Sequence, residues 1–323
     1  MMNSFVVEET GIVPSGQGHG QVLVFVAPDE REKTLIRSQF HLDEYDLSST
    51  LDSDEVPRAE TSSERTLIIW KIPRSARVSE AIELGVFPVS LLLAGDRMAF
   101  VMSEGQTVFS AREFRNCRDV KDVLLGFLLH TIRHYVGHLR VIKQMSSELE
   151  RKITVSMENK HLLQMFALGE SLVYYVDAIE GNGAVLSKLL AMAGAIGLDN
   201  RQRQLLDDII LENNQAARQA NIYSSILSGL MDARGTIVNN NMNVLLKNLT
   251  LINIVFLPLN LIASIGGMSE WSMMTRRLPW EISYGLFCLG MAFFGWLTWI
   301  LVTRLIDRRG ERRRRKEGGG GPL

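Results

Sequence analysis

The chain has 323 residues, with 35 Lys and Arg against 36 Asp and Glu, and a formal net charge of −1. This length allows about two domains plus a membrane part. The charge is uneven, because the segment from Arg304 onward holds 8 Lys or Arg and 3 Asp or Glu, which leaves 27 basic and 33 acidic residues elsewhere. An acidic body argues against a nucleic-acid-binding protein, and no nucleic-acid partner is expected.

The two cysteines, Cys117 and Cys288, are too few and too far apart to predict a disulfide framework, and a reducing compartment is expected. Residues 1–21 lack a basic stretch followed by a long apolar core, so no secretory signal is expected. The amino-terminal portion is therefore expected to stay in the cytosol.

Residues 1–118 are expected to form a cytosolic α/β domain. Residues 1–20 are polar and rich in glycine and are expected to be partly mobile. Apolar and β-branched runs predict strands at 21–27 and 66–72 and a hairpin over 86–101 that turns at 94–97. A helix is expected at 29–40, and the acidic stretch 41–64 is read as a solvated loop or helix surface.

Strand signals stop near residue 119, and long helical patterns follow. A cytosolic helical region is expected over 119–199 and a stalk helix over 200–248, with patterns at 120–144 and 147–177 and breaks near 181–183 and 194–197. His130, His134 and His138 have a spacing that can hold zinc on one helix face, but an ordinary polar face is the preferred interpretation. No nucleophile and base pair, phosphate loop or metalloenzyme motif appears, so we expect no enzyme and no cofactor other than a transported or regulatory divalent cation.

Residues 249–268 (LTLINIVFLPLNLIASIGGM) carry no charge and are long enough to cross roughly 30 Å of hydrocarbon. A loop at 269–281, a second span at 282–306 and a basic tail at 307–323 follow. The positive-inside rule places that tail in the cytoplasm and the loop outside, as in a bacterial inner-membrane protein with both termini cytoplasmic. The tail could also bind anionic lipid or nucleic acid, but orientation alone explains its charge.

A stripe of residues at steps of three and four shares one face of the first span and of the segment before it. The stripe consists of Asn243, Leu246, Thr250, Asn253, Leu257, Asn260, Ser264 and Gly267. Amides inside a bilayer need a partner, so the stripe either joins helices or faces an aqueous path. In the second case Leu257 forms an apolar ring that gates by dewetting, and Pro258 can kink the helix there. Two spans cannot enclose a channel, so a homo-oligomer around an axis is implied.

This layout resembles the CorA family of divalent-cation transport proteins. The matching stretches are SGLMD (228–232), LKNLT (246–250), FLPLN (256–260) and IASIGGM (262–268), with weaker similarity at 42–60 and at 172–189 around Asn182. The resemblance implies a homopentamer in membrane lipid, with first spans lining the pore and a cytosolic funnel. By position, Asn243, Leu246, Leu257, Asn260 and Ser264 match pore-lining places. Asp208 matches a carboxylate that senses intracellular magnesium, or is simply a solvated carboxylate on a helix surface.

Two departures from the family pattern concern selectivity. The family's glycine-methionine-asparagine signature is here Gly267, Met268 and Ser269, and Gly266 stands where an aromatic residue is usual. The outer loop sets Arg276 and Arg277 against Glu270 and Glu281, and ten arginines in a pentamer would repel a divalent cation unless they pair with the glutamates.

The sequence thus predicts an α+β membrane protein with a cytosolic α/β domain, a long stalk helix, two transmembrane helices and a pentameric funnel. Its expected function is a homopentameric channel or transporter for divalent metal cations, magnesium or zinc-like, with an altered selectivity filter. The alternative is a CorA-like membrane scaffold or sensor that does not conduct Mg²⁺. A third reading is altered ion choice, including anions, prompted by the loop arginines.

Overall fold

The structure is a computed structural model that describes residues 2–8, 11–16, 20–52, 54–62, 64–74, 77–78, 82–105, 109, 111–155, 159–274 and 279–317. The chain divides into two compact units, Met1–Asp232 and Ala233–Leu323, and each unit is described by itself.

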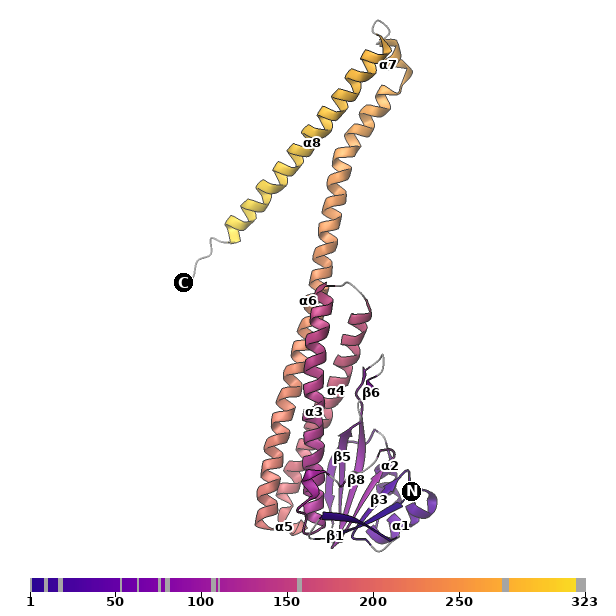
Figure 1. Ribbon diagram of the computed structural model, residues 1–323, viewed down its shortest axis with the longest axis vertical. Coiled ribbons are helices and arrows are strands. Elements are labelled where there is room, and N and C mark those ends of the chain that lie inside the picture. Colours follow the sequence, from indigo (N-terminus) through magenta and orange to yellow (C-terminus); the bar gives the residue numbers. More distant parts are fainter. Residues whose placement is uncertain are drawn as a thin grey trace. The chain divides into compact units, whose positions relative to one another are not determined.

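The first unit is built on a seven-stranded sheet with the order β2-β1-β3-β9-β8-β5-β4 (Figure 1). Its strands are β1 (Met2–Glu8), β2 (Gly11–Ser15), β3 (Val22–Val26), β4 (Arg58–Thr61), β5 (Thr66–Pro73), β8 (Val86–Ala94) and β9 (Arg97–Met102). Neighbouring strands are antiparallel except β3 and β9, which pair in parallel with Val24 opposite Phe100. Two short strands, β6 (Arg77–Val78) and β7 (Ile82–Glu83), pair with each other.

The central strands β3, β5, β8 and β9 are buried on both faces, and their alternate side chains enter two separate cores. In β3, Leu23 and Phe25 pack with Ile36 and Phe40 of α1 (Glu30–Phe40), and α2 (Glu44–Leu51) lies on the same face. The other face of the sheet, which includes Trp70, packs against long helices. Figure 1 shows the sheet between these two helical layers.

The long helices of this unit are α3 (Val120–Val155), α4 (Asn159–Ala191) and the first part of α6 (Asn200–Gly266), with short helices η1 (Arg112–Phe114) and α5 (Ala193–Ile196). The strand and helix expectations at 21–27, 29–40 and 66–72 and the hairpin at 86–101 are confirmed as β3, α1, β5 and the pair β8 and β9. The break near 194–197 is confirmed too, because Gly197 ends α5 with a positive φ of 74°.

Several expectations about the first 200 residues are wrong. Residues 2–8 and 11–15 form the strands β1 and β2, which were not expected, and the stretch 41–64, expected as a loop or helix surface, contains the helix α2 and also the unexpected strand β4. The helix α3 continues through 145–146, and α4 continues through 181–183. The glycines there serve close packing: a β-carbon on Gly181 would lie 2.9 Å from Pro57 Cγ, and one on Gly183 2.9 Å from Asn213 Nδ2.

The contact between Asn182 and Lys71 joins α4 to the sheet. The Asn182 side chain is fully buried, accepts a hydrogen bond from the Lys71 N–H (3.0 Å) and donates one to the Lys71 carbonyl (2.8 Å). The last β5 residue that pairs with β4 is Ile69, so the Asn182 amide takes the place that another β4 residue would have. The Tyr135 hydroxyl of α3 donates to the same carbonyl at 3.1 Å.

We predict that Asn182→Ala lowers the free energy of unfolding by about 2–4 kcal/mol, because both backbone groups of Lys71 lose a buried partner. Urea unfolding of the purified chain in detergent measures this. The matched control is Asn221→Ala, which removes an exposed amide bonded to Glu180 at 2.8 Å and should change stability by less than about 0.5 kcal/mol. Equal losses in the two variants would contradict this role of Asn182.

Candidate ion pathway

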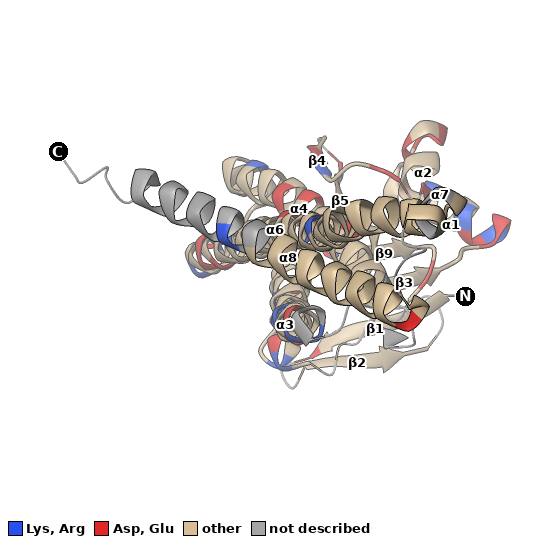
Figure 2. Ribbon diagram, turned by 90° about the horizontal axis from the view of Figure 1, so that it is seen from above, with Lys and Arg blue, Asp and Glu red and all other residues tan. Residues whose placement is uncertain are grey.

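Three helices are long and apolar enough to cross a membrane: Lys160–Ala191, Asn200–Gly266 and Trp280–Ile300. The first of these lies in α4, whose apolar side chains, among them Leu168 and Leu172, are buried in the core of the first unit. The other two lie in α6 and in α8 (Trp280–Glu317), and at most 6% of their apolar windows is buried. Figure 2 shows the α8 ribbon without charged residues along its apolar stretch.

The polar stripe lies on the exposed surface of α6. All eight members of the stripe are exposed in the single chain, and Leu257 is 70% exposed. These residues are Asn243, Leu246, Thr250, Asn253, Leu257, Asn260, Ser264 and Gly267, the last of which directly follows the helix. One continuous helix thus holds the seven residues up to Ser264 along one face.

The side of α6 that contacts α8 is a different one. A β-carbon on Gly266 would overlap the Phe287 ring of α8, and one on Gly295 would lie 3.3 Å from Leu259 Cδ1. Leu259 is two positions after Leu257, and two positions correspond to about 200° around a helix. The stripe therefore faces away from α8.

The amides on this face are unpartnered within the part of the chain that the structure describes. Within the described residues, the side chains of Asn243, Asn253 and Asn260 form no hydrogen bond, whereas the Thr250 hydroxyl donates to the Leu246 carbonyl of its own helix at 2.8 Å. An unpaired amide in hydrocarbon is unfavourable by several kcal/mol. In a bilayer, water or another copy of the chain must therefore meet Asn253 and Asn260.

The helix runs through Pro258 without ending. Proline has no N–H, so the Ile254 carbonyl, four residues earlier, loses its usual helical donor. This gap lies beside Leu257, between the levels of Asn253 and Asn260. The middle of the stripe thus combines a large exposed apolar side chain with a weakened helical hydrogen-bond ladder.

The glycine-methionine-serine triplet forms the end of α6. The Gly267 N–H donates to the Ala263 carbonyl at 3.0 Å and the Met268 N–H to the Ile265 carbonyl at 3.2 Å, so both residues close the last turn. Ser269 begins the short helix α7 (Ser269–Met274). The loop expected at 269–281 is therefore partly helical.

The charges of the outer loop are only partly described. Arg276 and Arg277 lie outside the described residues, and so does the side chain of Glu270. Glu281 lies in the first turn of α8 and is exposed. The expected repulsion of a divalent cation by these arginines, unless they pair with the glutamates, stays a prediction.

The metal-ligand candidates of the first unit do not converge. Asp208 is exposed on α6 beside Asp207, and the described part of the chain contains no group of three His, Cys, Asp or Glu that could hold a metal ion. The histidines of α3 form structural contacts instead. His138 Nδ1 lies 2.6 Å from Tyr175 Oη of α4, and His130 Nδ1 lies 3.5 Å from Glu113 Oε2.

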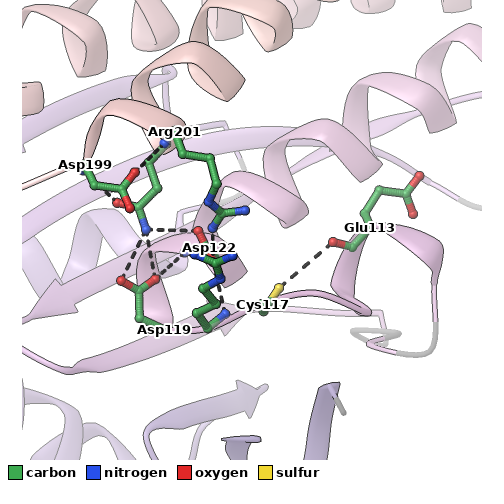
Figure 3. Close-up of polar contacts among 8 residues, drawn as sticks. Glu113, Cys117, Asp119, Asp122, Asp199 and Arg201 are labelled. Atoms are coloured by element: carbon green, nitrogen blue, oxygen red, sulfur yellow. Dashed lines mark hydrogen bonds and ion pairs between the residues drawn. The ribbon is translucent and has the colours of Figure 1, made fainter. Parts of the chain in front are cut away.

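A polar network that the sequence analysis missed joins the amino-terminal ends of α3 and α6 (Figure 3). The Gln202 amide nitrogen donates to Asp119 Oδ1 (3.0 Å) and to Asp122 Oδ1 (2.9 Å), while Gln202 Oε1 accepts from the Asp199 N–H (3.0 Å). Arg201 bonds Asp122, which is only 5% exposed. The sequence does carry a signal for the two helix starts, because aspartates such as Asp119 and Asp199 are common N-caps. It carries no signal that the two helix starts meet, because Gln202 and Asp122 are about 80 residues apart in sequence.

Cys117 lies beside this network, and its thiol has low reactivity. It is 3% exposed, and its thiol lies 4.0 Å from the Glu113 carbonyl. Burial, with the charges of Asp122 and Asp119, raises the pKa of the Cys117 thiol to about 12. The thiolate is therefore scarce at neutral pH, and the residue acts as a small apolar side chain.

Comparison with known proteins identifies the family to which the chain belongs. A family model described as "CorA-like Mg2+ transporter protein" matches residues 22–309. The chain belongs to this CorA-like family. It is thus a divalent-cation transporter of the CorA family, and the resemblance found in the sequence is confirmed.

Individual members of the CorA-like family are also similar to this chain in sequence and in structure. The "Cobalt/magnesium transport protein CorA" of Methanocaldococcus jannaschii is 25% identical over 247 residues, which are 75% of this chain and 77% of the relative. The complete structure of the CorA magnesium transporter from the same organism has a TM-score of 0.76 at 18% identity, covering 94% of this chain and 97% of that chain.

Two further structures share the CorA-like fold. Full-length CmaX has a TM-score of 0.71 at 12% identity and covers 94% of this chain and 97% of its own. The ZntB cytoplasmic domain from Vibrio parahaemolyticus has a TM-score of 0.58 at 8% identity, covering 74% of this chain and 98% of that domain. The soluble α/β part and the long helices of the expected fold class are thereby confirmed.

We predict that Gly266→Ala destabilises the contact of α6 with α8 by about 1–3 kcal/mol, because the new methyl group overlaps the Phe287 ring. Thermal unfolding in detergent measures the effect in the wild type and in a Phe287→Ala background, where it should nearly vanish. Gly285→Ala is the control, because no atom lies within 4 Å of its β-carbon. A loss of the same size in both backgrounds would contradict this packing.

We predict that His138 makes stability depend on pH. Burial, with a smaller contribution from His134, lowers the pKa of His138 to about 4, against about 6.5 in the unfolded chain. The unfolded state therefore binds the extra proton first as the pH falls, and stability that is complete above about pH 6.5 is lost through about pH 4.

The expected loss from this group between pH 7.5 and pH 5 is about 2 kcal/mol. Urea unfolding at both pH values, compared between the wild type and His138→Asn, isolates it. The asparagine variant should lose correspondingly less stability on acidification. An identical pH response would show that other groups are responsible.

Proposed function

We propose that the chain forms a homopentameric channel or transporter of the bacterial inner membrane, in which five copies of α6 line a pore for divalent metal cations. The observation that supports this most directly is the amide stripe on the side of α6 that faces away from α8. The second helix of the same chain does not satisfy these amides, so copies arranged around an axis would turn them toward shared water.

The proposed topology has two spans, 249–268 and 282–306, with the loop 269–281 outside. The basic tail 307–323 then lies in the cytoplasm, and so does the amino-terminal portion. Residues 1–118, 119–199 and 200–248 would form the funnel below the membrane as α/β domain, helical region and stalk.

The proposed cargo is a hydrated or partly hydrated cation. Mg²⁺ gives up its inner water shell reluctantly, so amide and hydroxyl oxygens suit its outer shell. Asn260 and Ser269 would supply such oxygens, together with Gly267 and Met268 in the selectivity filter. Ser269 has a shorter side chain than the asparagine usual in the family. We therefore propose that this position determines whether Mg²⁺ or a zinc-like ion is selected.

Leu257 is the proposed gate. Five exposed leucines at one level would form an apolar constriction that closes by dewetting, and the gap in the helical ladder at Pro258 would let the helix bend there. Asp208 is proposed as a regulatory cation ligand at a subunit interface, consistent with its exposure on α6.

The test is ion flux into proteoliposomes containing the purified chain. We predict uptake of Mg²⁺, Zn²⁺, Co²⁺ or Ni²⁺ above that of empty vesicles, and at least tenfold greater leak for Leu257→Ala, since an apolar barrier is removed. Ile252→Ala is the control, because Ile252 is also a large apolar residue exposed on α6 but lies off the stripe. No uptake of any of these ions would favour the scaffold or sensor, and an unchanged leak would remove Leu257 as the gate.

The same assay tests the filter with Ser269→Asn. A gain of Mg²⁺ uptake relative to Zn²⁺ is expected, because the longer amide reaches a hydrated ion from the helix end. An unchanged ratio would place selectivity elsewhere.

A further inference from the structure

A basic groove lies in the first unit between the second half of α3 and the middle of α6, with a volume of about 1340 Å³. Its α3 wall carries Arg140, Lys143, Gln144, Ser147, Arg151 and Lys152, which recur at helical spacing. Gln219 and Tyr223 form the α6 wall, and His161 of α4 also lines the groove. No part of the proposed pore lies in this groove.

Within the described residues, the groove has more positive than negative charge. It holds four Lys or Arg and one carboxylate, Glu148, which bonds Lys152 at 2.6 Å. Within the described residues, Arg140 and Lys143 have no carboxylate partner and both are exposed. Cations held together on a rigid helix without counter-charges repel each other and favour a bound anion.

The form of the groove selects a particular kind of anion. Arg and Lys side chains bind phosphate oxygens, Arg often through two parallel hydrogen bonds. The volume is far larger than one phosphate needs and is sufficient for a drug-sized molecule. Tyr223 and Val136, both half-buried against the core, offer an aromatic ring and an apolar surface beside the cations.

We propose that this groove binds a nucleoside polyphosphate, with the phosphates on Arg140, Lys143 and Arg151 and the base against Tyr223. Gln144, Ser147 and Gln219 supply neutral hydrogen-bonding groups along the same cleft. The assignment rests on the groove alone and holds whether or not the chain conducts ions.

The test is isothermal titration of the full-length chain in detergent, in metal-free buffer at 150 mM salt, with ATP, tripolyphosphate and inorganic phosphate. Saturable binding of one ATP and of one tripolyphosphate per chain is expected, with inorganic phosphate at least a hundredfold weaker. Arg140→Ala/Lys143→Ala should weaken both polyphosphates at least tenfold. The control is Arg31→Ala/Arg37→Ala, which removes two exposed cations from α1 and should change neither affinity by more than twofold.

Tyr223 separates recognition of the base from simple charge attraction. Tyr223→Leu should weaken ATP about tenfold and leave tripolyphosphate within twofold, and Tyr223→Phe should restore ATP binding because the ring is kept. Circular dichroism and the melting temperature of each variant establish that it is folded.

Three outcomes would overturn the proposal. The first is no saturable binding of ATP or tripolyphosphate to the wild type. The second is an equal effect of the groove variant and the α1 control. The third is binding of the chain to phosphatidylglycerol vesicles that depends on Arg140 and Lys143 without binding of either soluble polyphosphate, which would assign the groove to a lipid headgroup.

Discussion

The cost of leaving an amide without a partner in hydrocarbon is the constraint on which the proposed pathway depends. Asn253 and Asn260 lie on a face of α6 that α8 does not contact, and the described residues of one chain do not satisfy them. In the proposed assembly, water on an axis shared by several copies would do so, and the same arrangement would bring the apolar Leu257 to that axis. Membership of the CorA-like family and the amide geometry are independent observations, and both point to ion transport.

A few buried polar contacts join segments of the first unit that are far apart in sequence. Asn182 joins α4 to β5, His138 joins α3 to Tyr175 of α4, and Gln202 joins the starts of α3 and α6. Each contact fixes one long helix against its neighbour at a defined level, which apolar packing alone specifies less sharply. The basic groove lies on this same set of helices, which sets the order of its cations along α3.

Elements with a periodic apolar pattern could be predicted from the sequence. Close contacts at glycines and polar contacts between distant segments could not. The strands β3 and β5, the two apolar spans and the stripe on α6 follow from repeats of two and of three to four residues. Gly181 and Gly183 were misread as a helix break because only the fold shows that Pro57 and Asn213 press against them. Strands β1 and β2 were missed because their apolar runs are short and are interrupted by polar residues, glycine and proline, and the pairing of β1 with β2 and β3 is a feature of the fold.

The way in which the sheet terminates beyond β4 affects solubility as well as docking. A strand that extends beyond its neighbour exposes unpaired backbone N–H and C=O groups, and a strand of another molecule can pair with them. At Lys71 the side-chain amide of a helix occupies both backbone groups, so this residue of β5 offers no free hydrogen bond to another strand. A single buried asparagine thus removes one point of strand addition where β5 extends beyond β4.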